Sequence, residues 1–293
     1  MTPVEVDSTL SARLLSATRV VHWRNGAAVG VLVAGGVIML LPFLWMAGTS
    51  LRPAGESYRL PPSIVPDEWT LDAYREALAS GIPFLRMYWN SFVVAFSATV
   101  GVLLTASMAG FAFARLSFRG SSLLFGLMLA GLMVPPALVL IPLYFGFAQV
   151  KLLDTPWALI FPAMSSSFGV YMMRQFMLGQ PRELEEAALV DGASYWTIFW
   201  RITLPQLGPP LAALGIITFT TSWNNFIAPF VLIKSWENMT LPAGIVAMQG
   251  LMGAASVSVV MAAATMAILP LLLVFLIAQR FIIEGMTMSG IKG

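Results

Sequence analysis

The chain has 293 residues, of which 58% are hydrophobic and only 10% charged, and its mean hydropathy is +0.82. A soluble domain carries about 25% charged residues, so this composition excludes an ordinary water-facing surface and predicts a protein of the bilayer. The net charge is only +2, and no basic run with interleaved aromatic residues suggests a nucleic-acid partner. Without cysteine and with one histidine, the chain cannot form disulfides, thiolate metal sites or a multi-histidine metal cluster.

Six long apolar runs without Asp, Glu, Lys or Arg predict an all-α integral membrane protein with six transmembrane helices. A spanning helix needs about 20 such residues. The runs cover approximately residues 27–49, 90–114, 122–148, 157–173, 210–232 and 256–278. We therefore expect one transmembrane domain over residues 26–282, between an N-terminal tail (1–25) and a C-terminal tail (283–293).

The Lys and Arg residues predict the orientation. With the N-terminus inside, ten of them flank the spans on the cytoplasmic side and six on the outside. This bias predicts a multi-pass membrane protein with both termini in the cytoplasm. The first apolar run is too long for an ordinary signal-peptide core, so we expect it to stay as the first span.

The long external loop, residues 51–89, contains a short amphipathic segment from Thr70 to Leu78. Thr70 is a suitable N-cap, and Leu71, Tyr74 and Leu78 share one helical face. That face either lies on the membrane surface, contacts a soluble partner, or packs as a connector on its own protein.

Prolines and small residues recur inside the predicted spans. Each proline removes a backbone donor and frees a carbonyl, so it marks either a kinked helix that lines a pathway or a packing kink. These prolines are Pro135, Pro136, Pro142, Pro162, Pro229 and Pro270. Ala106, Gly110 and Ala114 lie four residues apart, which predicts the close approach of two helices.

The cytoplasmic loop, residues 179–208, concentrates charged residues between two apolar runs. Pro181 begins a helix whose first turns carry Glu183, Glu185 and Glu186, where the helix dipole favours anions. Gly192 is expected to end this helix, Ser194 to cap a second one, and Pro205 to end that second helix. Two short helices joined in this way can transmit a rigid-body movement.

The spacing of this loop resembles the EAA signature of ABC-importer permeases: Glu-Ala-Ala, three residues, Gly, nine residues, then Ile-x-Leu-Pro. In that family the segment forms the coupling helix, which sits in a groove of the ATPase subunit. The alternative is an ordinary amphipathic cytoplasmic loop. The candidate ATPase-coupling residues are Glu186, Ala187, Ala188, Asp191, Gly192, Ala193, Leu204 and Pro205.

Over nearly its whole length the chain is similar to permease subunits of carbohydrate ABC importers, of the smaller maltose type. Besides the six spans and the loops, the resemblance rests on Trp223-Asn224-Asn225-Phe226 and on the tail from Gln279 to Gly293. It implies a type I importer fold, a second homologous permease, two ABC ATPase subunits and an external substrate-binding protein, all in contact with membrane lipids. It also implies no directly bound cofactor, because ATP and Mg²⁺ belong to the ATPase subunits.

The residues agree with a transport subunit that is not an enzyme. The chain has no G-x-x-x-x-G-K-[ST] loop to cradle nucleotide phosphates, so the energy must come from a partner. No span carries the ionisable residue that a proton-driven carrier usually needs, and no paired carboxylates or histidine cluster suggest a membrane enzyme. A permease for another solute, such as glycerol phosphate, and a non-transporting assembly factor remain as alternatives.

Polar residues within the spans are the candidates for the substrate path. Asn amides both donate and accept hydrogen bonds, which suits sugar hydroxyls, and an indole suits the apolar face of a pyranose. The alternative is that these residues bond to their own helix or bridge helices. We expect Asn224 or Asn225 nearest the substrate, with Trp223 behind or beside them. The full candidate list is Ser166, Thr221, Trp223, Asn224 and Asn225.

Overall fold

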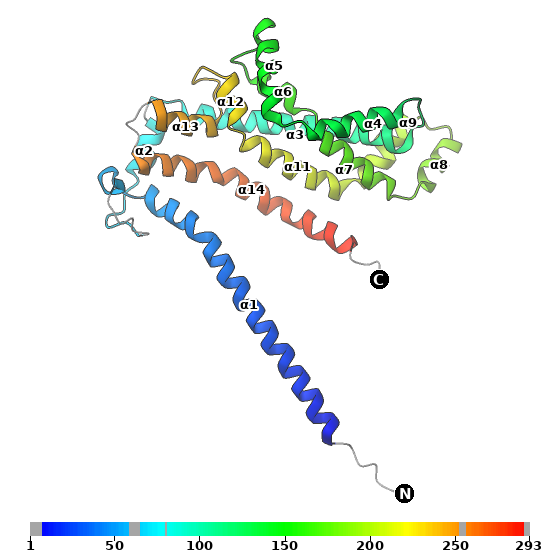
Figure 1. The fold of residues 1–293 in the computed structure, drawn as a ribbon, viewed down its shortest axis with the longest axis horizontal. Coiled ribbons are helices and arrows are strands. Elements are labelled where there is room, and N and C mark those ends of the chain that lie inside the picture. Colours follow the sequence, from blue (N-terminus) through cyan, green and yellow to red (C-terminus); the bar gives the residue numbers. More distant parts are fainter. Residues whose placement is uncertain (1–7, 59–64, 80, 252–255, 290–293) are drawn as a thin grey trace.

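The computed structural model describes residues 8–58, 65–79, 81–251 and 256–289, and every regular element within them is helical (Figure 1). This confirms the all-α class. Four helices form the main bundle, in which α3 packs on α7 and α11, and α11 packs on α14. Their bounds are α3 (Phe84–Arg115), α7 (Ser167–Leu178), α11 (Gly208–Trp223) and α14 (Val257–Ser289).

Shorter elements connect and cover this bundle. The end that the sequence predicts to be external carries η1 (Ala54–Tyr58), α2 (Asp72–Ala79), α12 (Ile227–Leu232) and α13 (Leu241–Leu251). At the opposite end lie α8 (Glu183–Val190), α9 (Tyr195–Ile198), the π-helix η3 (Phe199–Thr203) and α10 (Leu204–Gln206) (Figure 1). Between the two ends the chain forms α4 (Ser121–Ala130), η2 (Gly131–Met133), α5 (Pro136–Gln149) and α6 (Pro156–Ala163).

The membrane helices are less continuous than the hydropathy predicts. Within the described residues, three helical stretches are long and apolar enough to span a bilayer: Ala28–Ser50, Phe84–Arg115 and Val257–Ile277. Counting two bent pairs as spans raises the number to five, with bends of 101° after Met133 and 79° after Gln206. The predicted fourth span, 157–173, is divided between α6 and α7, of 8 and 12 residues. Hydropathy averages over such breaks, which is why six runs were predicted as six spans.

Three breaks interrupt the helices near the middle of the bundle: between η2 and α5, between α6 and α7, and between α11 and α12. Proline opens α5, and the extended Val134 before Pro135 has the conformation that a following proline favours. A helix break leaves backbone N–H and C=O groups unpaired, and within a bilayer the protein itself or a water-filled cavity must satisfy them. One of them, the Met164 carbonyl, accepts a hydrogen bond of 2.8 Å from Thr105 Oγ1 of α3.

The first helix, α1 (Ser8–Ser50), extends away from the bundle and is joined to it at its C-terminal end (Figure 1). None of its most apolar window is buried within the chain. At the joint, Thr49 and Ser50 are buried, and Ser50 Oγ shares a hydrogen bond of 2.7 Å with the Tyr74 hydroxyl of α2. The helix begins within the predicted N-terminal tail, and α14 likewise continues beyond the predicted sixth span to Ser289.

The small residues of α3 confirm the predicted close packing. Ala106, Gly110 and Ala114 are all buried against α7. A Cβ atom placed on Gly110 would lie 2.8 Å from the Met173 Cβ and 3.0 Å from the Arg174 backbone nitrogen. A larger side chain there would separate the two helices.

The amphipathic segment after Thr70 forms a helix, and the face that it buries in the chain is not the one that carries Leu71 and Leu78. In α2 the buried residues are Ala73 and Ala77, whereas Leu71 and Leu78 are exposed. Thr70 Oγ1 accepts a hydrogen bond from the Asp72 backbone N–H, at 3.1 Å, and so supports the first turn. Helix α2 packs on α14, while Leu71 and Leu78 stay exposed, as contact with the membrane surface or a soluble partner requires. The short side chains of Ala73 and Ala77 allow α2 to pack closely, and the hydrophobic pattern of the sequence did not reveal this alanine face.

Candidate functional site

The coupling segment, residues 179–208, has at its start the helix that the sequence predicts. After α7 ends at Leu178, α8 runs from Glu183 to Val190. Gly192 has φ +82°, and the chain turns through hydrogen bonds from Gly192 N–H to the Leu189 carbonyl (3.0 Å) and from Ala193 N–H to the Ala188 carbonyl (2.9 Å). This is the left-handed cap geometry for which glycine is suited.

The second short helix is longer than predicted. Ser194 caps it as expected, because its Oγ accepts a hydrogen bond from the Thr197 N–H at 3.2 Å. Pro205 does not end it, however, but lies in the first turn of α10, after the π-helical turn η3. A proline cannot donate to the carbonyl four residues earlier, here that of Arg201, and a local widening to a π-turn is one way to accommodate this defect. The helix ends at Gln206, and the chain then bends by 79° into α11.

The predicted coupling residues divide between two faces. Ala188, Ala193 and Leu204 pack against the hydrophobic core formed by α3, α7 and α11. The others are exposed: Glu186, Ala187, Asp191, Gly192 and Pro205. Beside them, large apolar side chains also face outward, with Val190 89% and Trp196 60% exposed.

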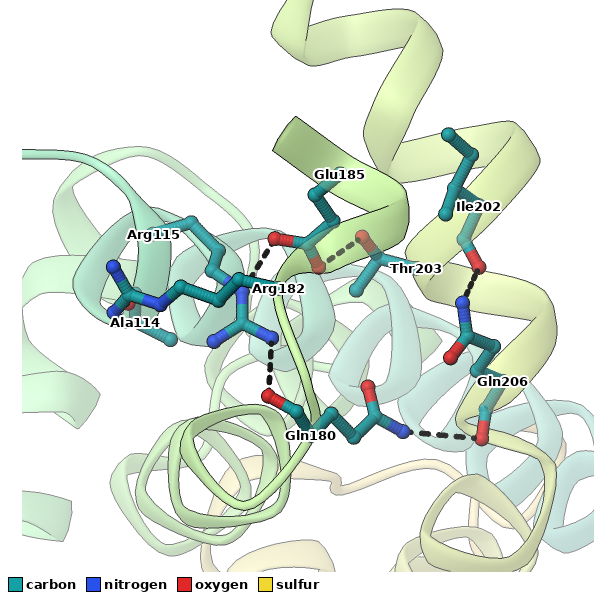
Figure 2. A network of polar contacts seen from close by, with 8 residues as sticks. All are labelled: Ala114, Arg115, Gln180, Arg182, Glu185, Ile202, Thr203 and Gln206. Carbon is teal, nitrogen blue, oxygen red and sulfur yellow. Dashed lines mark hydrogen bonds and ion pairs between the residues drawn. The ribbon is translucent and has the colours of Figure 1, made fainter. Parts of the chain in front are cut away.

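Polar contacts hold the base of the coupling segment against the bundle (Figure 2). Glu185, on the inner face of α8, forms an ion pair with Arg115, the last residue of α3, with Oε2 2.6 Å from Nε. Its other oxygen, Oε1, accepts a hydrogen bond from Thr203 Oγ1 at 3.1 Å. The sequence prediction assigned Glu185 only to the helix dipole and missed both partners, which lie far from it along the chain.

A cavity of about 510 Å³ lies in the half of the bundle that the sequence predicts to be external. Its wall includes residues at or beside all three helix breaks, and its hydroxyl and amide side chains are uncharged. Those side chains are Ser91, Ser165, Ser222, Asn225 and Thr240. The rest of the lining is apolar side chains and one glycine, and no Lys, Arg, Asp or Glu belongs to it. Such a cavity offers hydrogen-bonding groups among apolar walls, as sites for neutral small molecules do.

Of the candidate path residues, only Asn225 lines this cavity, with its Oδ1 3.4 Å from the Ala228 N–H that donates to it. Thr221 and Asn224 are exposed but lie outside the lining. Ser166 caps α7 by accepting a hydrogen bond of 3.0 Å from the Gly169 N–H, while its neighbour Ser165 lines the cavity instead. The break between α6 and α7, which the sequence did not reveal, decides which serine faces inward.

Trp223 lies outside the lining of this cavity, because the structure buries it at 2% exposure where α11 contacts α14. Its indole N–H donates to the Ala267 carbonyl at 3.1 Å, and its rings contact Phe219 and Tyr88. Tyr88 in turn donates to the Met266 carbonyl at 3.4 Å. This carbonyl lacks its usual helical donor, because the residue four positions later is Pro270, which has no N–H. Trp223 therefore supports the kinked α14 and has no free donor for a substrate.

Asp154 organises the loop at the rim of the bundle near the cavity. Its Oδ1 accepts hydrogen bonds from the backbone N–H groups of Lys234 (3.0 Å) and Ser235 (2.9 Å) and from the Ser235 hydroxyl (2.8 Å). Partial burial alone would raise the pKa of Asp154, but the hydrogen bonds from Ser235 and Lys234, together with the Lys234 charge, outweigh it and lower the pKa. The adjoining residues Leu232 and Thr240 line the cavity, so this loop borders it.

Comparison with known proteins places the chain in a family. The family model described as "Binding-protein-dependent transport system inner membrane component" matches residues 81–288. The arabinooligosaccharides transport system permease protein AraQ of Halalkalibacterium halodurans is 34% identical over 258 residues, covering 87% of this chain and 92% of the relative. The diacetylchitobiose uptake system permease protein NgcG of Streptomyces coelicolor is 32% identical (88% and 86%). The sn-glycerol-3-phosphate transport system permease protein UgpE of Escherichia coli is 31% identical (88% and 94%).

Two solved structures share the fold. One is a bacterial ABC transporter involved in the import of the acidic polysaccharide alginate, with a TM-score of 0.75 and 19% identity over 95% of this chain and 99% of that one. The other is a bacterial alginate ABC transporter in complex with its pentasaccharide-bound periplasmic protein, with a TM-score of 0.63, 16% identity, and coverage of 87% and 93%. The chain thus belongs to the family of binding-protein-dependent transport system inner membrane components and is a multi-pass permease subunit of an ABC importer, not an enzyme.

Proposed function

We propose that this permease forms half of the translocation path of an ATP-driven sugar importer in a prokaryotic plasma membrane, with both termini in the cytoplasm. A second, homologous permease forms the other half, and an external substrate-binding protein delivers the sugar. Two ABC ATPase subunits bind ATP and Mg²⁺, while the permease itself holds no cofactor. The oligosaccharide systems named for relatives at 34% and 32% identity support this assignment.

The exposed face of the coupling segment is the observation that carries the proposal. Val190 and Trp196 are large apolar side chains that face outward at one end of the bundle, beside the carboxylates of Glu186 and Asp191. Apolar groups that project from a water-exposed loop are typical of a protein interface. Because the opposite face packs on the core, an ATPase bound here would move the bundle with it.

The cavity supports a neutral saccharide rather than a phosphorylated solute. Its polar groups are hydroxyls and an amide, and its lining carries no cation to pair with a phosphate. Glycerol phosphate is the second candidate, because one relative at 31% identity is named for its transport. A cationic lining supplied by the second permease would be needed for it.

Reconstituted transport tests the proposal. The permease, its partner permease, the ATPase and the binding protein are placed in liposomes, and uptake of a labelled neutral oligosaccharide is measured beside ATP hydrolysis. We expect ATP-dependent uptake that glycerol phosphate does not inhibit. Val190→Asp should abolish uptake by disturbing the docking face, while Val150→Asp, an exposed valine near the opposite end, should not. Assembly and ATP hydrolysis without uptake of any solute would favour the assembly factor.

A further inference from the structure

The inner face of α8 is fixed to the bundle by a buried ion pair. The side chains of Arg115 and Glu185 are only 4% and 11% exposed, and their Nε and Oε2 atoms are 2.6 Å apart. Thr203 Oγ1 donates to the second carboxylate oxygen, so Glu185 joins α3, α8 and the π-turn η3 at one point (Figure 2). None of these contacts involves the exposed face to which we assign ATPase docking.

Three further contacts meet at the same end of α3. Arg182, the N-cap residue of α8, donates from Nη2 to the Ala114 carbonyl (3.2 Å), and Arg174 of α7 donates from Nε to the Phe113 carbonyl (3.2 Å). These carbonyls belong to the last turn of α3, which lacks intrahelical donors. Arg115 in turn donates from Nη2 to the Gln180 carbonyl at 3.4 Å. The start of the coupling segment is therefore tied to the last turn of α3 from both sides.

Helix α3 connects this junction with the substrate cavity without interruption. Of the three described helices longer than thirty residues, α1 contains Pro42 and α14 contains Pro270, but α3 contains no proline. Its 32 residues extend about 48 Å at 1.5 Å per residue. Towards its other end Ser91 lines the cavity, and the Ser91 Oγ accepts a buried hydrogen bond of 2.7 Å from the Leu241 N–H, where α13 begins.

We propose that the Arg115–Glu185–Thr203 contact transmits movement of the coupling helix to α3 and through it to the cavity. Arg115, Glu185 and Thr203 are then positioning residues for transport, distinct from the exposed docking residues. This inference rests on the proposed importer function. A rigid helix moves as a unit, so an ATPase that displaces α8 displaces the Ser91 end of α3 only while the junction holds.

The junction depends on charge as well as packing. Arg115 Nε and Nη1 are buried and have no hydrogen-bond partner in the part of the chain that the structure describes, so the contact with Glu185 is an ion pair held by charge. If Glu185 becomes neutral, the buried guanidinium loses its counter-ion, and the charge attraction that holds α8 is lost. The exposed side chains of α8 are unchanged by that substitution, so the ATPase can still bind.

The test uses the complete reconstituted complex and reports transported sugar per ATP hydrolysed, normalised to assembled complex. Glu185→Gln should lower this ratio on the order of ten-fold while ATP hydrolysis changes little. Thr203→Val, which keeps the side-chain shape and removes the donor, should lower it by a smaller factor in the same direction. Glu183→Gln, an exposed carboxylate on the same helix, is the matched control and should leave the ratio unchanged. The reciprocal pair Arg115→Glu with Glu185→Arg should recover part of the loss.

The results for these variants distinguish a role of Glu185 in transmitting movement from a role in ATPase docking. A normal ratio for Glu185→Gln overturns the proposal, as does a parallel loss of hydrolysis and transport, which would place Glu185 in ATPase docking. If Glu185→Gln does not assemble, Thr203→Val decides: a normal ratio there overturns the proposal, and a lowered ratio supports it. If the parent complex assembles and hydrolyses ATP but takes up no solute, the importer assignment itself fails, and that failure is separate from any result at Glu185. If Val190→Asp leaves uptake intact, only the assignment of the docking face fails.

Discussion

Gly192 provides the sharpest test of the coupling segment, because its substitution acts through the backbone alone. Its φ of +82° lies in the left-handed region, and a Cβ atom added there would meet no atom within 4 Å. An L-residue with a side chain pays about 1–2 kcal/mol for this conformation, and a β-branched residue is at the upper end. The expected cost therefore rises from Gly through Asn and Ala to Val, without any steric clash.

The strain is relieved if the last turn of α8 unwinds. Unwinding breaks the two cap hydrogen bonds that Gly192 and Ala193 donate to the Leu189 and Ala188 carbonyls. A cost of about 1–2 kcal/mol changes the ratio of wound to unwound turns by a factor of about 5–30. Because Val190 lies at that end of α8, the docking face would lose its shape while the bundle stays folded.

The assay compares sugar uptake with ATP hydrolysis in the reconstituted importer. We expect uptake to fall in the order Asn, Ala, Val at position 192, with complex assembly unchanged. Gly208→Ala is the matched control, since Gly208 also has no atom within 4 Å of its added Cβ but has no left-handed φ and begins α11. Full uptake by Gly192→Val would refute the inference that the capped end of α8 has to be rigid.

Three further predictions concern the core, the rim of the bundle and the topology. Trp223→Ala should destabilise the protein by about 3–5 kcal/mol, whereas Trp223→Phe should cost about 1 kcal/mol for the lost hydrogen bond and leave sugar preference unchanged, as measured by thermal unfolding and uptake. Because the folded-state pKa of Asp154 is lowered, its carboxylate stabilises the fold above the ordinary pKa of 3.8 and less so as pH falls through the folded value. Asp154→Asn should therefore lower the unfolding temperature at pH 7, and the difference from the parent should shrink in acid. A reporter fused after Gly293 should read cytoplasmic and one inserted near Pro66 external, and the opposite result would overturn the predicted orientation.

The coupling segment was predictable in detail because its signals are local. Gly192 ends α8 and Ser194 caps α9 through contacts within a few residues, and sequence rules describe such contacts well. The role of Pro205 was not predictable in the same way. A proline both ends helices and occupies their first turn, and only the π-turn before it shows which of the two applies here.

The long-range contacts could not be read from the sequence. Glu183, Glu185 and Glu186 look equivalent as acidic residues in a first turn, yet only Glu185 is buried. What distinguishes it is Arg115 at the end of another helix, and no spacing rule connects the two. The same limit applies to Trp223, whose partner carbonyl belongs to α14.

The helix breaks explain how a chain without charges in its apolar runs places polar groups in a largely apolar cavity. Unwound backbone at residues 134–135, 164–166 and 224–226 brings peptide groups to the same region as Ser165, Ser222 and Asn225. In a bilayer such groups are tolerated where protein or a water-filled cavity satisfies them. Pro136, Pro162 and Pro229 line the cavity, so these three prolines favour the interpretation as a pathway. Dipoles without net charge suit a neutral, hydroxyl-rich solute. Helix α3 remains unbroken beside these interrupted helices, and this continuity is what the transmission of movement from α8 requires.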